Sequence, residues 1–493
     1  MPTMLAAPIL ALAVLLCAGC GSDRVSSDWP VANRDPASTR ASEGGIDGTN
    51  VRRLHAAWRF RFPIRPRESG VFTATPIVVG DTVYVQDMES DVFALELGTG
   101  HMRWQRRLRA GTPGPNGLAV ADGRVLGSTD TTAFALDAGS GRVLWQRRLV
   151  NRTESFVDIA PVVSRGTVYT STVGYGPGSH GALYALSAET GAVRWKFSTI
   201  RDPWRYPREA GGGGAWQPIS IDGDGRVYAG ISNPTPWGGS RRRPNGGAFP
   251  GPALYTDSLL VLDGATGRLL WYDQVTPHDV RDYDFHISPI LATLGTGADE
   301  RNVVFGAGKA GRVIAWDRDS RRRLWDIRVG LHRNDTGRLP RRSVRVCPGL
   351  LGGVLTPMAY ADNRLFVPVV DLCFSENAYG SAARSFVHTD PSKGKGELVA
   401  LDAATGRRLW SRRFAAPNFG CATVSNDVVF AATYDGRVYA MRASDGRTLW
   451  STKARAGVNA CPAVAGDLLL VGAGAEHPSY DRPVFELIAH RLS

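Results

Sequence analysis

One phrase recurs along this chain and constrains its fold more than any other feature. It approximates A-x-D-x-x-T-G-x-x-x-W, as in ALDAATGRRLW and VLDGATGRLLW. Seven copies end at a tryptophan: Trp104, Trp145, Trp195, Trp271, Trp325, Trp410 and Trp450. Successive tryptophans lie 41, 50, 76, 54, 85 and 40 residues apart, so the unit has about 40 residues and the longer steps contain insertions. This period indicates a repeat array.

Each unit has the pattern of four short strands. In residues 75–86 (TPIVVGDTVYVQ) two apolar or alternating runs flank a Gly-Asp turn, and DVFALEL and MRWQRRL supply two more strands. One such sheet cannot bury both of its faces alone, and the recurring tryptophan is placed to fill the gap between neighbouring sheets. Four strands in about 40 residues predict a β-propeller.

The two ends of the chain complete one another. Residues 484–492 (VFELIAHRL) have the pattern of a third strand with no fourth, and residues 54–62 (LHAAWRFRF) that of a fourth strand with no third. Joining them predicts an all-β, eight-bladed propeller of four-stranded blades, closed by N- and C-terminal strands without an open edge. We expect one propeller domain over residues 51–493, with insertions near 199–215, 236–254, 330–347 and 371–396.

The formal charge of +12 raises the question of a nucleic-acid partner. The cations are nearly all arginine, since lysine occurs only at positions 196, 309, 393, 395 and 453. Short basic runs are scattered and are not interleaved with aromatic residues that could stack on bases. We interpret the charge as a solvated basic surface and expect no nucleic-acid partner.

The N-terminus has the pattern of an export signal. Residues 5–16 form an apolar run too short to span a membrane and suited to the core of a signal peptide. Ala18-Gly19-Cys20 follows and resembles the end of a bacterial lipoprotein signal, although Cys17 stands where leucine is usual. We expect a signal peptide over residues 1–20, lipidation of Cys20, a location in the cell envelope and a membrane anchor. Residues 21–50 are expected to form an N-terminal segment that leads into the propeller.

Four cysteines remain beyond the signal, and four allow three pairings. Cys421 in NFGCATV and Cys461 in VNACPAV occupy equivalent places in successive repeats. We therefore predict a Cys421–Cys461 disulfide and, with it, Cys347–Cys373. Four buried free thiols are the alternative, which an oxidising compartment disfavours.

The repeat and several longer segments resemble the quinoprotein alcohol dehydrogenases, which use pyrroloquinoline quinone (PQQ). Residues 28–40 (DWPVANRDPASTR) and 50–60 resemble the start of that family, and residues 212–237 resemble its fourth blade. Residues 255–284, ending in TPHDVRDYD, resemble the stretch that carries its catalytic loop. The family oxidises an alcohol or sugar hydroxyl with PQQ and a bound metal, calcium or a lanthanide, and this chain would pass its electrons to a separate acceptor.

The resemblance implies roles for individual residues. Trp216 matches the indole on which PQQ stacks, and Lys309 matches a cation near the quinone oxygens. Asp282 matches the catalytic base. The metal ligands would be Asn233, Asp282 and Asp284, the last at a position where an extra carboxylate accompanies lanthanide use.

Other family positions are changed. No cysteine pair lies near residues 109–117, Asn116 or Pro115 stands where an arginine is expected, and Gly176 stands where a glutamate binds the metal. Asp158 takes the place of a threonine that meets a cofactor carboxylate, and its charge would repel PQQ unless it binds metal. Arg281 replaces a tryptophan beside Asp282, where it could favour the ionised carboxylate.

Two interpretations follow from this mixture. In the first, the chain is an exported PQQ-dependent dehydrogenase with Asp282 as its base, a reading favoured by the retained cofactor-facing positions. In the second, it is a non-catalytic, lipid-anchored propeller that serves as a binding or assembly scaffold, a reading favoured by the lost positions.

Overall fold

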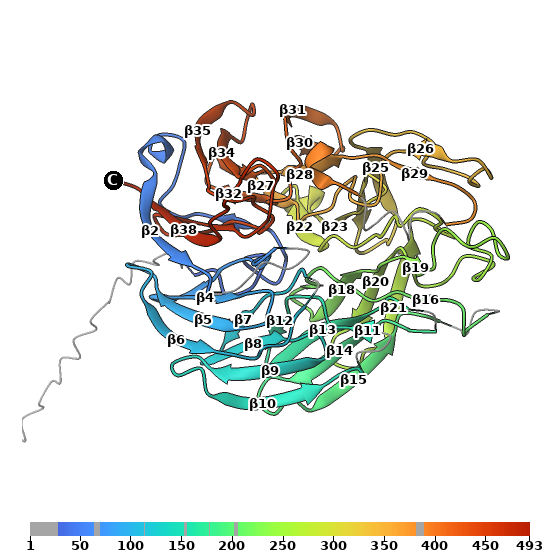
Figure 1. The fold of residues 1–493 in the computed structure, drawn as a ribbon, viewed down its shortest axis with the longest axis horizontal. Coiled ribbons are helices and arrows are strands. Elements are labelled where there is room, and N and C mark those ends of the chain that lie inside the picture. Colours follow the sequence, from blue (N-terminus) through green and yellow to red (C-terminus); the bar gives the residue numbers. More distant parts are fainter. Residues whose placement is uncertain are drawn as a thin grey trace, which may run out of the picture.

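The computed structural model describes residues 28–63, 70–112, 114–151, 155–176, 178–201, 206–380 and 389–493. The predicted signal peptide and the predicted lipidation site Cys20 lie outside them. Within them, eight antiparallel sheets of four blade strands follow one another around a ring in chain order (Figure 1). The predicted all-β, eight-bladed propeller is confirmed.

The strands of each blade run in sequence from the axis outward. Blades 1 and 2 consist of β3 (Ile77–Val79), β4 (Thr82–Gln86), β5 (Val92–Glu96), β6 (Met102–Arg106), β7 (Ala119–Ala121), β8 (Arg124–Ser128), β9 (Thr132–Asp137) and β10 (Val143–Arg148). Blades 3 and 4 consist of β12 (Val162–Ser164), β13 (Thr167–Gly174), β14 (Ala182–Ser187), β15 (Val193–Ser198), β17 (Ser220–Ile221), β18 (Arg226–Gly230), β20 (Ser258–Asp263) and β21 (Leu269–Gln274).

The second half repeats the arrangement. Blades 5 and 6 consist of β22 (Ile290–Leu294), β23 (Arg301–Ala307), β24 (Arg312–Asp317), β25 (Arg323–Arg328), β27 (Ala359–Ala361), β28 (Arg364–Asp371), β30 (Lys395–Asp402) and β31 (Arg408–Phe414). Blades 7 and 8 consist of β32 (Ala422–Ser425), β33 (Val428–Ala432), β34 (Arg437–Arg442), β35 (Thr448–Lys453), β36 (Ala463–Ala465), β37 (Leu468–Ala473), β38 (Glu486–Arg491) and β2 (His55–Arg61).

A few short elements lie outside the blades. They are β1 (Ala41–Ser42), β11 (Ser155–Phe156), the ribbon of β16 (Gly211–Gly212) with β19 (Pro234–Thr235), the ribbon of β26 (Val344–Val346) with β29 (Phe374–Glu376), and the 3-10 helices η1 (Val51–Arg53), η2 (Gly297–Asp299) and η4 (Pro391–Lys393). In the described part of the chain, no helix has the length and apolar character needed to cross a membrane.

The ring closes as the sequence predicts. Strand β38 near the C-terminus pairs on one side with β37 and on the other with β2 near the N-terminus, so blade 8 is built from both ends of the chain (Figure 1). This pairing gives β38 a partner on each edge.

The tryptophan and the glycine of the repeat recur because the two residues form one contact between neighbouring blades. The indole of Trp145 in blade 2 lies against Gly191 in the turn of blade 3, where a Cβ would stand 2.5 Å from the ring. The indole N–H donates to the backbone oxygen of Ala188 in the same turn, at 3.0 Å. The same arrangement recurs between most neighbouring blades, with indole donors Trp58, Trp104, Trp195, Trp325 and Trp410. Trp450 also donates to the next blade, at the backbone oxygen of Leu54, but, within the described residues, without a glycine against its ring.

This docking predicts a difference between two glycines. Gly191 and Gly80 both have positive φ, +68° and +58°, but a Cβ at Gly80 would meet nothing within 4 Å. We expect Gly80→Ala to lower the free energy of unfolding by about 1–2 kcal/mol through backbone strain. Gly191→Ala should lose about 1–3 kcal/mol more, because its methyl group collides with Trp145. Urea denaturation measures both, and equal losses would contradict the docking role.

The N-terminal segment lines the inside of the ring. Its backbone oxygens accept hydrogen bonds from innermost strands around the ring, beginning with Val78 of β3 to Trp29 at 3.0 Å and Val120 of β7 to Pro30 at 2.8 Å. The segment continues past β17, β22 and β27, and β1 then adds in parallel to β32 of blade 7. Residues 29–42 therefore fill part of the axial channel, and their side chains reach the space at its centre.

Candidate active site

The segments that precede the innermost strands of the blades meet around the axis. Because the blades are equivalent, the residue before each innermost strand reaches the same level. A cavity of about 520 Å³ lies there, and its wall includes Thr75, Ala160, Gln217, Thr356, Cys421 and Cys461 from six different blades. Its size is that of an ordinary small-molecule site.

Trp216, the residue on which PQQ is predicted to stack, supplies an aromatic wall of this cavity. Its indole is stacked on the imidazole of His286, with ring centroids 4.0 Å apart and planes within 4°. The ammonium of Lys309 lies 5.4 Å from the centroid of the indole. Sequence reasoning missed His286, whose only signal is its place two residues after Asp284.

Beside Trp216, four of the predicted site residues form one buried cluster. The ammonium of Lys309 bridges two carboxylates, at 2.6 Å from Asp282 Oδ2 and 2.6 Å from Asp284 Oδ2. The Asn233 amide donates to Asp282 Oδ1 at 2.9 Å, and its backbone N–H donates to Asp284 Oδ1 at 2.8 Å. All four side chains are buried. The cluster adjoins Trp216 through Lys309 but does not itself line the cavity.

The stretch TPHDVRDYD, residues 276–284, is shaped by its own side chains. The carboxylate of Asp279 accepts from the backbone N–H groups of Arg281 and Tyr283, at 2.8 and 2.6 Å, and this turns the loop. Asp282 follows with a φ of +64°, which directs its side chain toward Lys309. The stretch is therefore a structured loop at the site and not a solvated turn.

The expectation that Arg281 supports the ionised form of Asp282 is wrong. Its guanidinium donates to the backbone oxygens of Asn334 and Thr336, both at 2.9 Å, in the insertion after blade 5. The cation beside Asp282 is Lys309, which lies in the turn between β23 and β24 of blade 5. The side chains of Arg281 and Asp282 leave this turn in different directions, so proximity in sequence did not give proximity of charge.

Burial dominates the electrostatics of the cluster. It raises the pKa of Asp282 to about 8, against the opposing effect of Lys309. Burial opposes protonation of Lys309, yet the carboxylates of Asp282 and Asp284 raise its pKa above the ordinary value. Burial likewise lowers the pKa of His286 to about 4, so its imidazole against Trp216 is neutral at neutral pH.

Two further aspartates add negative charge. Asp257, at 0% exposure, has a pKa raised well above its ordinary value by burial and by the carboxylates of Asp279, Asp284 and Asp282. Neither of its carboxyl oxygens has a hydrogen-bond partner at normal geometry among the described residues, although the Phe285 N–H is near enough to lower its pKa slightly. Burial raises the pKa of Asp279 to about 6. The region thus holds four acidic groups and one bridging ammonium.

Asp158 lies apart from this cluster. It is buried in the segment before β12, where the Thr112 hydroxyl donates to it at 3.5 Å. Burial raises its pKa well above the ordinary value. Nothing in the structure directs this side chain at the metal ligands predicted from the sequence.

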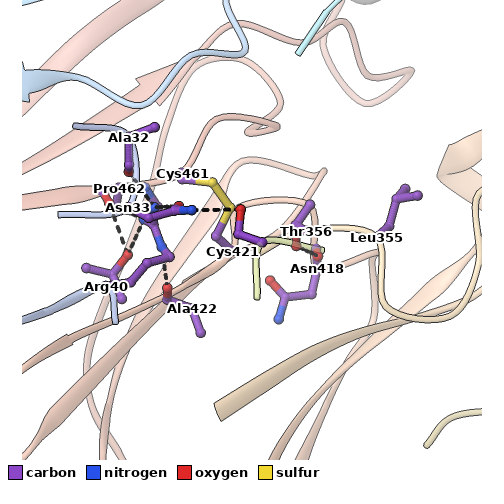
Figure 2. Close-up of a disulfide and its surroundings, with 12 residues drawn as sticks. Ala32, Asn33, Arg40, Leu355, Thr356, Asn418, Cys421, Ala422, Cys461 and Pro462 are labelled. Atoms are coloured by element: carbon purple, nitrogen blue, oxygen red, sulfur yellow. Dashed lines mark hydrogen bonds between the residues drawn. A yellow bond between two sulfur atoms is a disulfide. The ribbon is translucent and has the colours of Figure 1, made fainter. Parts of the chain in front are cut away.

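Both predicted disulfides are present. Cys347–Cys373 joins the segments next to β26 and β29, and Cys421–Cys461 joins blades 7 and 8 at the cavity (Figure 2). Among the residues that the structure describes, no three His, Cys, Asp or Glu side chains are gathered as metal ligands. A cation at the cluster would depend on the Asn233 amide oxygen together with Asp282 and Asp284.

Known proteins resemble the chain along most of its length. A family profile described as "Glucose/ethanol/alcohol dehydrogenase, beta-propeller domain", of PQQ proteins, matches residues 29–330. A second profile, "Outer membrane protein assembly factor BamB", matches residues 310–479. A quinohemoprotein alcohol dehydrogenase of Comamonas testosteroni is 29% identical, over 83% of this chain and 67% of that protein. A putative dehydrogenase, XoxF, of Paracoccus denitrificans is 27% identical, over 84% and 81%.

Solved structures share the fold. The quinohemoprotein alcohol dehydrogenase of Comamonas testosteroni superposes with a TM-score of 0.81 at 23% identity, over 94% of this chain and 80% of that chain. A europium-containing methanol dehydrogenase superposes with a TM-score of 0.80 at 20% identity, over 94% and 98%.

Proposed function

Because the chain belongs to the PQQ family of glucose, ethanol and alcohol dehydrogenase propellers, we propose that it is a quinoprotein dehydrogenase that oxidises an alcohol or sugar hydroxyl. The observation that supports this most is the convergence of Asp282, Asn233 and Lys309 beside Trp216. These residues come from separate segments of the chain, and they assemble a base, an amide, a cation and an aromatic ring in one buried place.

The donor set suits a hard cation. Oxygen donors from two aspartates and an amide are those that calcium and related ions prefer. The surrounding acidic groups outnumber the one bridging ammonium, and a cation would relieve that imbalance. We propose that Asn233, Asp282 and Asp284 would hold calcium or a lanthanide, with Lys309 shifting its contacts as the metal enters.

The cavity suits a flat aromatic cofactor. Trp216 offers a planar wall that is stiffened by the stacked His286, and the cavity of about 520 Å³ has room for a tricyclic ring. Amide and hydroxyl groups around it, such as Asn116 and Thr73, can donate hydrogen bonds to cofactor oxygens. PQQ, when bound, supplies a two-electron acceptor for the carbon that is oxidised.

The chain's own residues would accept the proton of the substrate hydroxyl and orient the groups that react. We propose that Asp282 accepts the proton of the substrate hydroxyl at one carboxyl oxygen while Asn233 fixes the other. Lys309 holds the carboxylate in place until substrate arrives, and the buried surroundings exclude water. Electrons would leave to a separate acceptor. The signal-like N-terminus and the two disulfides support an extracytoplasmic location, with a lipid anchor if Cys20 is modified.

Binding of PQQ to purified protein without its signal segment tests the cofactor assignment. We expect saturable quenching of tryptophan fluorescence that requires calcium or lanthanum, and a much weaker response in Trp216→Phe. The matched control is Trp145→Phe, which changes a docking tryptophan between blades and should bind PQQ normally. Absence of binding with either metal would leave the dehydrogenase proposal without a cofactor.

One observation favours a second candidate. The match to the assembly-factor profile covers residues 310–479, and a solved BamB from Moraxella catarrhalis shares the fold with a TM-score of 0.54 at 14% identity over 89% of this chain. Under this alternative the chain is a non-catalytic scaffold, and partners would bind its insertions. Failure to bind PQQ together with co-purification of an envelope protein would favour it.

A further inference from the structure

The Cys421–Cys461 disulfide is part of the cavity wall. Both cysteines border the cavity, and they hold equivalent positions ahead of the innermost strands β32 and β36. The bond therefore ties blades 7 and 8 together where they face the axis (Figure 2). Cys347–Cys373, in contrast, does not border the cavity.

This wall faces Trp216. Trp216 precedes the innermost strand of blade 4, and Cys461 precedes that of blade 8. Blades 4 and 8 lie four places apart in a ring of eight, on opposite sides of the axis (Figure 1), and both residues border the cavity between them. A flat ligand against Trp216 would extend toward the disulfide.

A buried cation lies directly behind the disulfide. Arg40, at 0% exposure, donates to the backbone oxygens of Ala422 and Pro462, the residues that follow the two cysteines, at 2.8 and 2.7 Å (Figure 2). Its other donors bond to Ala32 O, Asn33 Oδ1 and Thr423 Oγ1, at 2.8, 3.1 and 2.7 Å. Ala32 and Asn33 also border the cavity.

The charge of Arg40 has no counterion nearby. All of its recorded hydrogen bonds go to neutral oxygens, and no carboxylate forms an ion pair with it in the described parts of the chain. Burial lowers its pKa to about 9, which still leaves it protonated at neutral pH. The acidic side chain on the cavity wall is Glu476, which is exposed. A buried cation without a counterion makes the adjacent wall favourable for an anion.

We propose that the Cys421–Cys461 disulfide, backed by Arg40, is the wall that receives the carboxylate end of a flat aromatic ligand whose ring lies against Trp216. This names the ligand class of the proposed cofactor site and rests on that proposal for the cofactor's identity. Cys421 and Cys461 contact the ligand, whereas Arg40 acts through them and through Asn33 as a positioning residue.

Protection from reduction tests the contact between the ligand and Cys421–Cys461, and Cys347–Cys373 serves as the control in the same molecule. The probe is acridine-9-carboxylate, a flat tricyclic carboxylate that is not a quinone. At about ten times its dissociation constant it should slow reduction of Cys421–Cys461 by a water-soluble phosphine about tenfold, because bound protein is shielded. Reduction of Cys347–Cys373 should not change. Alkylation followed by peptide mass spectrometry reports both bonds.

The outcomes separate the inference from the proposed function. Equal protection of both disulfides, or none, would overturn the inference. If the acridine binds and protects only Cys421–Cys461 while PQQ does not bind, the inference stands and the dehydrogenase proposal fails. Because the measurement uses the native chain, it does not depend on whether a cysteine variant folds.

Variants of Arg40 test the charge behind the wall. We expect native protein to bind acridine-9-carboxylate more tightly than its neutral carboxamide. The ratio of the two affinities should fall about tenfold in Arg40→Gln, equivalent to about 1.4 kcal/mol, and persist in Arg40→Lys. A purely structural role would weaken both ligands together in both variants, and that result would remove Arg40 from the proposal.

Discussion

Replacing Lys309 with methionine should lower the free energy of unfolding by about 3–5 kcal/mol. The change leaves Asp282 and Asp284 buried at the cluster without the ammonium that bridges them, and breaking a buried ion pair from one side costs about this much. Urea denaturation in chelator measures the loss. Lys196→Met is the matched control, because Lys196 is exposed and its loss should change little.

Lys309→Met also tests whether a metal ion binds to the cluster. A cation that binds Asp282 and Asp284 can replace the missing ammonium, so calcium or lanthanum should restore about 2.7 kcal/mol at a hundred times its dissociation constant. The part of the loss that comes from Asp282 should also shrink as the pH falls toward about 8, because its pKa is higher still without Lys309 and protonation removes the unpaired charge. An undiminished stability in Lys309→Met would contradict the buried cluster itself. Lost stability without rescue by either metal would count against the metal site.

Replacing Asp282 with asparagine should lower kcat for alcohol oxidation by about 10²–10⁴-fold while PQQ binding persists. Asparagine keeps an oxygen for the metal but cannot accept the substrate proton. Steady-state kinetics separate this from a binding defect, which would raise KM. The control is Asp319→Asn on the exposed surface. Full activity in Asp282→Asn would assign the base elsewhere.

The pH dependence of the oxidation rate of the native enzyme also tests whether Asp282 is the base. A base must be ionised to act, and burial raises the pKa of Asp282 to about 8. The rate of the PQQ-loaded enzyme should therefore rise with pH as Asp282 ionises. A bound cation favours the carboxylate, so the rising limb should move to lower pH with calcium and further with lanthanum.

The propeller could be predicted because its repeat is a local pattern with a physical cause. Trp145 and Gly191 occupy one docking contact, and most blades present the same pair to their neighbour. The split blade followed from two incomplete patterns at the ends of the chain. Cys421–Cys461 followed from equivalent positions in adjacent repeats, which the ring brings to the axis.

The side-chain contacts of the site could be predicted only in part. Asn233, Asp282, Asp284 and Lys309 were identified by resemblance, and the structure gathers them. The direction of Arg281 was not predictable, because it depends on the carbonyl groups of a distant insertion. Asp257 had no motif, since its importance lies in being buried near other carboxylates.

Arg40 shows a second limit. In the sequence it is one of many arginines in a basic chain. Its special position arises because the N-terminal segment runs inside the ring and places it behind blades 7 and 8. Burial and the absence of an ion-pair partner distinguish it, and both are properties of the tertiary structure.

Reduction of bound PQQ by an alcohol in a single turnover tests the central claim most directly. Protein loaded with PQQ and calcium or lanthanum is mixed with a primary alcohol or glucose, and the absorbance of the quinone is followed. The account predicts loss of the oxidised spectrum at a rate that depends on alcohol concentration and falls about 10²–10⁴-fold in Asp282→Asn. Bound PQQ that stays oxidised with every alcohol and sugar tried, or that is reduced equally fast by the variant, would contradict it.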